Sequence, residues 1–225
     1  MNSLSNKRRP TIVGIGGLTS EVGKTTLLCK LLSAFPGWEA IKTTRGHYRS
    51  CGKDPHTCCV SDLLSEEAVV RSGRESTYAA GKDTGKYWEA GAANVHWVIA
   101  TDEQVEAGIN EALGRVKADG VFVEGNSFTE FVKPDFFVMV ARSDQTKIKS
   151  TAKRVLKNIS ALYLSGTATE GERVLVLLDQ GLVGVGLDLP VFSPHDFSAL
   201  VERVRAIDSC HALSAAANQS SVQAS

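Results

Sequence analysis

The stretch Val13-Gly-Ile-Gly-Gly-Leu-Thr-Ser-Glu-Val-Gly-Lys-Thr-Thr26 carries the most informative pattern in this chain of 225 residues. The apolar run over residues 11–15 predicts a buried strand, and the apolar spacing of residues 27–32 predicts a helix. The glycine-rich loop between them would turn its backbone N–H groups toward a polyphosphate, as would the N-terminus of the helix. The order of strand, loop and helix therefore predicts a site for a nucleoside triphosphate.

Within this loop the Lys24 ammonium is expected to reach the β- and γ-phosphates, and the Thr25 hydroxyl to ligate Mg²⁺. The usual pattern has four residues between a glycine and Gly-Lys-Ser/Thr, whereas five separate Gly17 from Gly23. Either Leu18 replaces the first glycine or the loop holds one extra residue. The alternative is a turn that merely joins strand to helix. The predicted nucleotide-binding residues are Gly17, Thr19, Ser20, Glu21, Val22, Gly23, Lys24, Thr25 and Thr26.

A second nucleotide signal lies in Gly120-Val-Phe-Val-Glu-Gly-Asn126, an apolar strand that ends in a carboxylate. Glu124 would hold the Mg²⁺ shell or orient the attacking water, and would act in catalysis with Lys24. The alternative for Glu124 is a charge at the surface end of a strand. The Asn/Thr-Lys-x-Asp pattern that usually reads guanine is absent, so these residues leave GTP and ATP open.

Composition narrows the classes of protein. Hydrophobic residues make up 43% of the chain, which is ample for a packed core. Lysine plus arginine and aspartate plus glutamate number 25 each, so no basic excess favours nucleic acid. We see no membrane-length apolar run and no secretory signal, and expect a cytoplasmic protein. The five cysteines are odd in number, which fits a reducing compartment better than a disulfide scaffold.

Strand-like and helix-like runs alternate along the chain, and several strands are continuously apolar, as suits a parallel sheet covered on both faces. We expect an α/β fold, a three-layer P-loop NTPase domain over residues 10–208 with a mainly parallel sheet of about seven strands. Residues 1–9 would form a disordered arm and residues 209–225 a flexible tail. The expected strands are 11–16, 38–43, 95–100, 120–124, 135–141, 173–178 and 190–192, and the expected helices 24–34, 62–72, 83–92, 103–118, 145–158 and 196–207.

A cysteine- and histidine-rich segment follows the second expected strand, within a loop over residues 47–61. Thiolate and imidazole groups suit Zn²⁺ or Ni²⁺, so Cys51, His56 and Cys58 are candidate ligands of one ion. Cys59 or His47 would complete the site. Because the spacing matches no standard zinc motif, the alternative is a switch loop with incidental cysteines.

The segment Gly81-Lys-Asp-Thr-Gly-Lys-Tyr-Trp-Glu-Ala-Gly-Ala92 resembles a block of the molybdopterin-guanine dinucleotide biosynthesis protein B family. Ile41-Lys42-Thr43, Val123-Glu124-Gly125 and Leu189-Pro-Val-Phe192 are similar to further segments of that family, in the same order, although Thr43 stands where the family has histidine.

The resemblance implies a homodimeric P-loop GTPase that assists nucleotide attachment to the molybdenum cofactor beside a nucleotidyltransferase. It also implies that Asp83, as a catalytic residue, and Glu89 line the active face. Helix capping is the alternative for Asp83, and a plain surface charge the alternative for Glu89.

Four functions remain open at this point. The first is a slow GTPase that assists molybdenum-cofactor biosynthesis, with nucleotide and Mg²⁺ bound and no nucleic-acid or membrane partner. The second is a metallochaperone-type GTPase that acts with a metalloenzyme maturation partner. The third is an ATP-dependent small-molecule kinase or ligase, and the fourth is a nucleotide-sensing adaptor that does not hydrolyse its ligand.

Overall fold

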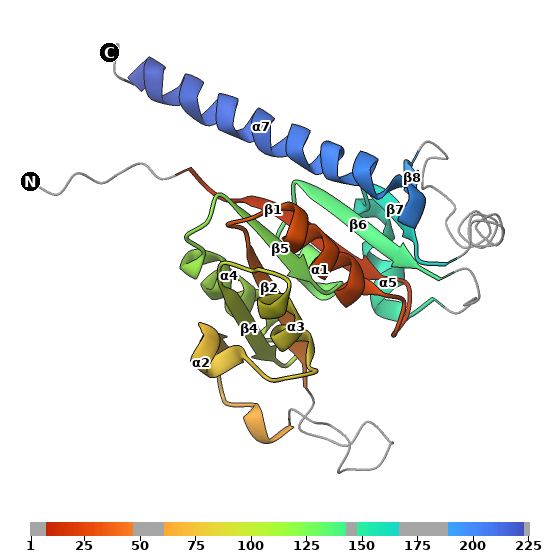
Figure 1. Ribbon diagram of the computed structural model, residues 1–225. Helices are drawn as coiled ribbons and strands as arrows, with labels where there is room; N and C mark the ends of the chain where they lie inside the picture. Colours follow the sequence, from red (N-terminus) through yellow and green to blue (C-terminus); the bar gives the residue numbers. More distant parts are fainter. Residues whose placement is uncertain (1–7, 47–60, 143–147, 167–188, 223–225) are drawn as a thin grey trace, which may run out of the picture.

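A computed structural model describes residues 8–46, 61–142, 148–166 and 189–222. The described strands form one sheet in the order β3-β4-β2-β5-β1-β6-β7-β8 (Figure 1). Neighbouring strands are parallel except for β3, which runs antiparallel to β4. The strands are β1 (Thr11–Gly17), β2 (Glu39–Arg45), β3 (Val69–Ser72), β4 (Val95–Ala100), β5 (Gly120–Glu124), β6 (Phe136–Ala141), β7 (Ala161–Leu164) and β8 (Val191–Phe192).

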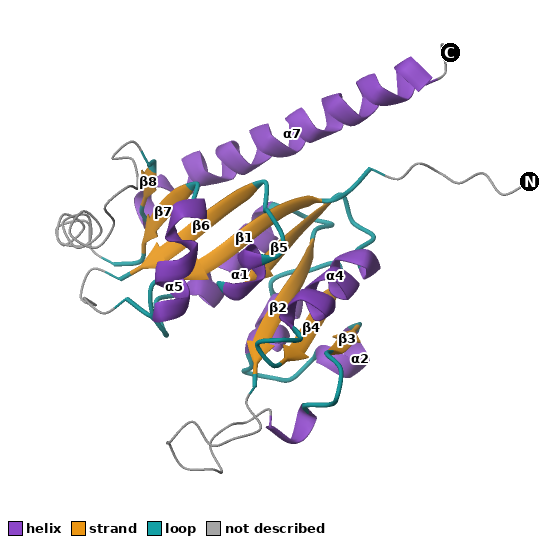
Figure 2. Cartoon of the chain, turned by 180° about the vertical axis from the view of Figure 1, so that it is seen from behind, coloured by secondary structure: helices purple, strands orange, loops and turns teal. Residues whose placement is uncertain are grey.

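Helices cover both faces of this sheet, as Figures 1 and 2 show from opposite sides. One core cluster joins the sheet to α1, α3 and the start of α7, and the other joins it to α4, η2 and α5. This confirms the expected three-layer α/β fold. The helices are α1 (Lys24–Ala34), α2 (Arg74–Thr77), α3 (Asp83–Glu89), α4 (Val105–Arg115), α5 (Ser150–Val155) and α7 (Phe197–Val222), with 3-10 turns η1 (Ser61–Leu63), η2 (Ser127–Glu130), η3 (Leu156–Asn158) and η5 (Pro194–Asp196).

The central strands are apolar on both faces, because each face is covered. All seven residues of β1 and all six of β6 are buried. Such strands lack the alternation of a half-exposed sheet and belong in the interior of a parallel one. Their carboxyl ends meet at one edge, where the loop after β1 and Glu124 at the end of β5 come together.

The helix expected over residues 62–72 is wrong. Only a short 3-10 turn, η1, lies there, and Val69–Ser72 form the edge strand β3. Val69 and Val70 pair with Ile99 and Val98 of β4, so the β-branched pair extends the sheet. An available sheet edge is a tertiary feature, which the local spacing of apolar residues does not report.

The last helix is longer than the expected span of residues 196–207, because α7 continues to Val222. Its first turns pack on the sheet through Leu200, Val201 and Val204. Farther along, Asp208 pairs with Arg8 at 2.6 Å, and the chain then projects from the body (Figure 1). The alanines after residue 213 favour continued helix, so α7 runs beyond the expected helix end at residue 207.

Two other predicted elements lie wholly or partly outside the described residues. The strand expected at 173–178 lies outside them, and so does the start of the helix expected from residue 145. Of the chain that the structure describes, no helix is both long enough and apolar enough to span a bilayer.

Helix α3 contains Gly85, which sequence reasoning treats as a helix breaker. A Cβ at this position would lie 2.1 Å from the carbonyl oxygen of Ala79. The glycine therefore lets α3 pack against the chain that leads into it. This close packing fixes the N-terminus of α3, and with it Asp83, at the sheet edge that carries Glu124.

Candidate functional site

The loop after β1 begins one residue later than its glycines suggest. The Leu18 N–H donates to the Val140 carbonyl at 3.0 Å, and its own carbonyl accepts from Lys149 N at 2.9 Å. The Leu18 side chain is buried in the core. Leu18 is therefore the last residue held by the sheet. The loop proper is Thr19–Gly23, which favours the interpretation that Leu18 takes the place of the first glycine.

The backbone of this loop turns sharply before α1. Glu21 has a φ of 59° and Gly23 a φ of 91°, both in the left-handed region. Helix α1 has no acidic residue in its first turn and no side-chain cap. Its first N–H groups consequently lack helical partners, and together with the helix dipole they favour an anion.

The Lys24 side chain curls back over the start of the loop. A Cβ on Gly17 would lie 2.8 Å from Val22 Cγ2 and 2.9 Å from Lys24 Cδ, so a larger residue here would displace both side chains. Gly17 is itself held by the Asn126 side chain, which accepts from Gly17 N at 2.8 Å and donates to Gly17 O at 2.9 Å. The Lys24 side chain therefore lies against Gly17 at the start of the loop.

A compact polar cluster surrounds Glu124, whose side chain is 2% exposed. Thr25 Oγ1 donates to Glu124 Oε2 at 2.9 Å. The Tyr87 hydroxyl donates to the same oxygen, and Lys42 Nζ pairs with the other oxygen, Oε1. Lys42 and Glu124 are direct neighbours in the β2–β5 register, and Lys42 Nζ also lies 2.7 Å from Asp83 Oδ2.

The electrostatics of the cluster indicate an excess of positive charge beside the loop. Burial lowers the pKa of Lys24; Glu124 opposes this shift, but Lys42 and Lys149 reinforce it. Burial also lowers the pKa of Lys42, yet Glu124 and Asp83 outweigh it and raise the net value. A polyphosphate bound at the loop would supply the missing negative charge and favour the protonated form of Lys24.

Residues that follow β7 and precede α5 also contact the loop and hold it in place. Ser165, just after β7, donates its hydroxyl to the Val22 carbonyl, and Lys149 Nζ donates to Ser20 Oγ. These contacts come from residues more than 120 positions away along the chain. They fix the backbone of the loop, and Lys149 adds a cation to its rim.

The structure brings four of the predicted site residues together: Lys24 and Thr25 from the first turn of α1, Glu124 from β5 and Asp83 from α3. Asp83 does not cap its helix through its side chain, since Lys82 is the N-cap residue and no side-chain cap bond forms. Glu89 instead accepts from the exposed Tyr78 hydroxyl at 3.1 Å, which favours its interpretation as a surface charge.

Sequence reasoning missed several members of the cluster. Lys42 had a signal, because it is a charged residue next to the apolar Ala40-Ile41 pair of a strand. Tyr87 lies within the segment that resembles the molybdopterin family but carries no local signal of contact with Glu124. Lys149 and Ser165 reach the loop only through the folded sheet, so no local pattern could have identified them.

The donor set suits Mg²⁺. The hydroxyl of Thr25 and the carboxylates of Glu124 and Asp83 are oxygen ligands, which a hard cation prefers, and phosphate oxygens commonly complete such a site. The candidate Zn²⁺ or Ni²⁺ ligands Cys51, His56, Cys58 and Cys59 lie outside the described residues. Within the described ranges, no group of three or more histidine, cysteine, aspartate or glutamate side chains is placed to hold a metal ion.

No protein-family model matches this chain, and no curated protein matches it. Several solved structures resemble it, and three of them illustrate the range of the likeness. LpxK from Aquifex aeolicus, crystallised with ATP, is 15% identical, with a TM-score of 0.48 over 82% of this chain and 53% of that one. A Zn(II)-bound triple mutant of YjiA GTPase is 12% identical, with a TM-score of 0.42 over 82% and 57%. Signal recognition particle receptor FtsY from Elizabethkingia anophelis, in complex with GDP, is 14% identical, with a TM-score of 0.37 over 85% and 58%.

This chain thus spans little more than half of the length of these proteins. At such identities and TM-scores, none of the likenesses indicates a shared activity, and none shows membership of the molybdopterin family. The loop after β1, the carboxylate at the end of β5 and the parallel order of the sheet nevertheless make this chain an α/β fold of the P-loop NTPase type.

Proposed function

We propose that this protein binds a nucleoside triphosphate with Mg²⁺ at the N-terminus of α1 and slowly hydrolyses its terminal phosphate. The observation that carries the proposal is the contact between the Thr25 hydroxyl and Glu124, beside a lysine whose pKa is lowered by burial and by neighbouring cations. A helix start that lacks acidic residues and is bordered by three lysines matches the charge of a triphosphate.

The residues of the chain divide the work. The N–H groups of the loop and of the first turn of α1 hold the phosphates, and the Lys24 ammonium contacts the terminal ones. Thr25, Glu124 and Asp83 would hold Mg²⁺, which when bound neutralises charge that develops on the phosphate oxygens. Tyr87 and Lys42 position the Glu124 carboxylate through its two oxygens.

Slow turnover follows from how these groups are engaged. Phosphoryl transfer depends on positioning and on stabilising charge, and an arginine often supplies much of the latter. Arg45, at the end of β2, is paired with Asp102 at 2.7 Å. Glu124 and Asp83 are both bound by Lys42, which leaves neither as a free base.

The family resemblance extends the proposal to a biological setting. It supports GTP as the nucleotide, a homodimer as the assembly, and assistance to molybdenum-cofactor biosynthesis beside a nucleotidyltransferase as the role. The residues in the site favour neither GTP nor ATP. Comparing the two nucleotides therefore tests this part of the proposal separately from phosphate binding.

The test is phosphate release from GTP and from ATP with Mg²⁺, compared between the natural protein and Thr25→Ala. We expect slow release that depends on Mg²⁺, a preference for GTP, and a loss of at least about 100-fold in Thr25→Ala. Ser33→Ala removes a hydroxyl on the same helix that only bonds backbone carbonyls, and should leave the rate unchanged. Equal rates in Thr25→Ala and in the natural protein would contradict the proposal.

We further propose that Cys51, His56, Cys58 and Cys59 bind one Zn²⁺ or Ni²⁺, on the basis of their ligand types and close spacing. Metal content per chain, measured after loading and desalting, should fall from about one to near zero when the three cysteines become serine. Cys210→Ser is the control, because this cysteine is exposed on α7. Unchanged metal content in the triple variant would contradict the assignment.

A further inference from the structure

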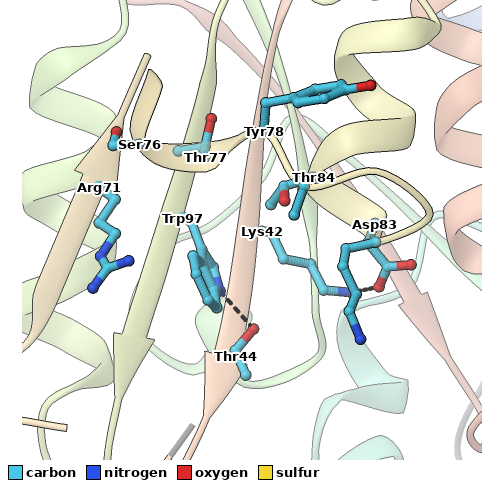
Figure 3. A pocket seen from close by; sticks show the side chains of 11 residues that line it. Lys42, Thr44, Arg71, Ser76, Thr77, Tyr78, Asp83, Thr84 and Trp97 are labelled. Atoms are coloured by element: carbon cyan, nitrogen blue, oxygen red, sulfur yellow. Dashed lines mark hydrogen bonds and ion pairs between the residues drawn. The ribbon is translucent and has the colours of Figure 1, made fainter. Parts of the chain in front are cut away.

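A cavity of about 550 Å³ adjoins the Glu124 cluster on the α3 side of the sheet (Figure 3). Its floor is formed by side chains of β2, β3 and β4, namely Thr44, Arg71 and Trp97. The segment from α2 to the start of α3 forms the opposite wall. This volume lies within the range of about 300–1,000 Å³ typical of small-molecule sites.

Trp97 provides a fixed flat surface in the floor. Its indole N–H donates to Thr44 Oγ1 at 2.9 Å, which holds the orientation of the ring (Figure 3). The ring is only partly buried, although it belongs to a strand whose other residues are buried. An aromatic side chain that is rigidly held and left open on a cavity is suited to contact a flat or apolar part of a ligand.

Positive charge borders this aromatic surface. The Arg71 guanidinium lies 5.7 Å from the centre of the Trp97 ring, and Lys82 lines the opposite wall. Over the described ranges, neither cation has a carboxylate partner, and Asp83, the acidic residue of the lining, is already paired with Lys42. Planar guanidinium groups favour carboxylate and phosphate ligands. The cavity therefore favours a ligand that carries negative charge.

The cavity and the nucleotide site share two residues. Lys42 and Asp83 line the cavity, and the same Lys42 ammonium binds Glu124, which accepts from Thr25. Burial raises the pKa of Asp83, but the Lys42 ammonium outweighs this effect and keeps the net value low. A ligand in the cavity would thus lie on the side of the site where the terminal phosphate is expected.

We propose that this cavity binds a small organic acid with a flat ring as a second ligand beside the nucleotide. The ring lies against Trp97, and the acidic group, a carboxylate or a phosphate, binds Arg71. Its position next to the nucleotide rests on the proposed function, whereas its binding does not. Because both ligands contact the Lys42–Asp83 pair, each changes the affinity of the other by the same factor.

The test uses benzoate and phenyl phosphate as probes, with benzyl alcohol as the neutral comparison. The indole N–H signals of the three tryptophans are followed by NMR, and Trp97→Phe assigns the relevant one. Both acids should shift the Trp97 signal and leave that of the buried Trp38 in place. The tighter-binding acid identifies whether a carboxylate or a phosphate is preferred. A Trp97 signal that neither acid moves would overturn the proposal.

Variants define the anion contact. Arg71→Ala should weaken probe binding at least about 10-fold and Arg71→Lys less. Arg154→Ala is the matched control, because Arg154 is an exposed arginine of α5 paired with Glu130. Probe binding that is equally strong in Arg71→Ala and Arg154→Ala would overturn the role of Arg71. A shift caused equally by benzyl alcohol would overturn the acidic character of the ligand.

The two proposals fail separately. In Lys24→Ala the acids should still shift the Trp97 signal, although nucleotide binding is lost. If the natural protein binds nucleotide and the signal does not move, the cavity proposal fails alone. If the acids bind and nucleotide affinity is insensitive to Lys24, the nucleotide proposal fails alone. A probe that leaves nucleotide affinity unchanged would contradict the shared Lys42–Asp83 contact.

Discussion

Two buried polar networks share strand β2, and they differ in their balance of charge. Near the start of β2, Glu39 accepts from the N–H groups of Lys117 and Ala118 at 2.9 Å and pairs with His96 Nε2 at 2.7 Å. His96 Nδ1 then bonds Ser72 at 2.8 Å. This Glu39 network satisfies both oxygens of the carboxylate and both nitrogens of the ring.

The Glu124 cluster lies farther along β2, where Lys42 faces the end of β5. It is also fully hydrogen-bonded around its carboxylate, yet it is unbalanced in charge. Among the described residues, neither Lys24 nor Lys149 forms an ion pair with a carboxylate, and a cavity opens next to Lys42. This contrast distinguishes polar groups that stabilise this fold from polar groups that serve its function. A closed network, in which every polar group is paired and the charges balance, stabilises the sheet. Excess positive charge beside a cavity instead indicates a site for an anionic ligand.

Removing the charge at the centre of each network should give opposite results, with the largest effect at Glu124. Glu124→Gln should lower nucleotide turnover by at least about 100-fold, or about 2.7 kcal/mol, while the protein remains folded. Glu39→Gln should instead lower the free energy of unfolding by about 1–3 kcal/mol, because a buried network is broken. Turnover and urea unfolding of both variants check this contrast. Normal turnover in Glu124→Gln would contradict the expected contrast between the two networks.

Tyr87 is a positioning residue in the open cluster, and its loss should have a smaller effect. The buried hydroxyl of Tyr87 donates to Glu124, and burial raises its pKa far above the ordinary value, so it remains a donor at all working pH values. Tyr87→Phe should reduce kcat about 10-fold with little change in KM, since Glu124 Oε2 loses one of its two donors and keeps only Thr25. A change in KM with an unchanged kcat would instead indicate that Tyr87 contributes to nucleotide binding.

The Glu39 network should contribute to the pH dependence of stability. Burial raises the pKa of Glu39, but the hydrogen bonds from His96, Lys117 and Ala118 outweigh this effect, and the net pKa lies below the ordinary value of 4.5. In acid the unfolded chain therefore binds more protons than the folded one, and stability falls as the pH drops below about 4.5. The decrease of the free energy of unfolding with falling pH should therefore be shallower in Glu39→Gln than in the natural protein. An identical decrease in both proteins would contradict this assignment.

The smallest expected effect concerns strain in the phosphate loop. Glu21 is the one non-glycine residue of the described chain with a positive φ, and it lies at the open edge rather than in the closed network. Glu21→Gly should raise the free energy of unfolding by about 0.5–1 kcal/mol, as strain is relieved. Ser20→Gly, at a neighbouring position without positive φ, should lower it. Equal effects from both changes would show that no strain is stored at Glu21.

The sequence was informative where one segment alone determines the structure. The run from β1 through the loop to α1 is local, and so is β5 with its terminal Glu124. Lys42 meets Glu124 through strand register, and Ser165 reaches the loop from a distant strand, so neither contact could be inferred from a local pattern. The edge strand β3 was mistaken for a helix because its pairing with β4 is a tertiary interaction.

Nucleotide affinity in two lysine variants of α1 tests the central claim most directly. Lys24 curls over Gly17 into the charged edge, whereas Lys30 is exposed on the same helix, 5.9 Å from the centre of the Phe197 ring. Calorimetric titration with Mg²⁺ and GTP, and then with ATP, should show at least about 100-fold weaker binding in Lys24→Ala and a change of less than about twofold in Lys30→Ala. Undiminished affinity in Lys24→Ala would contradict the account.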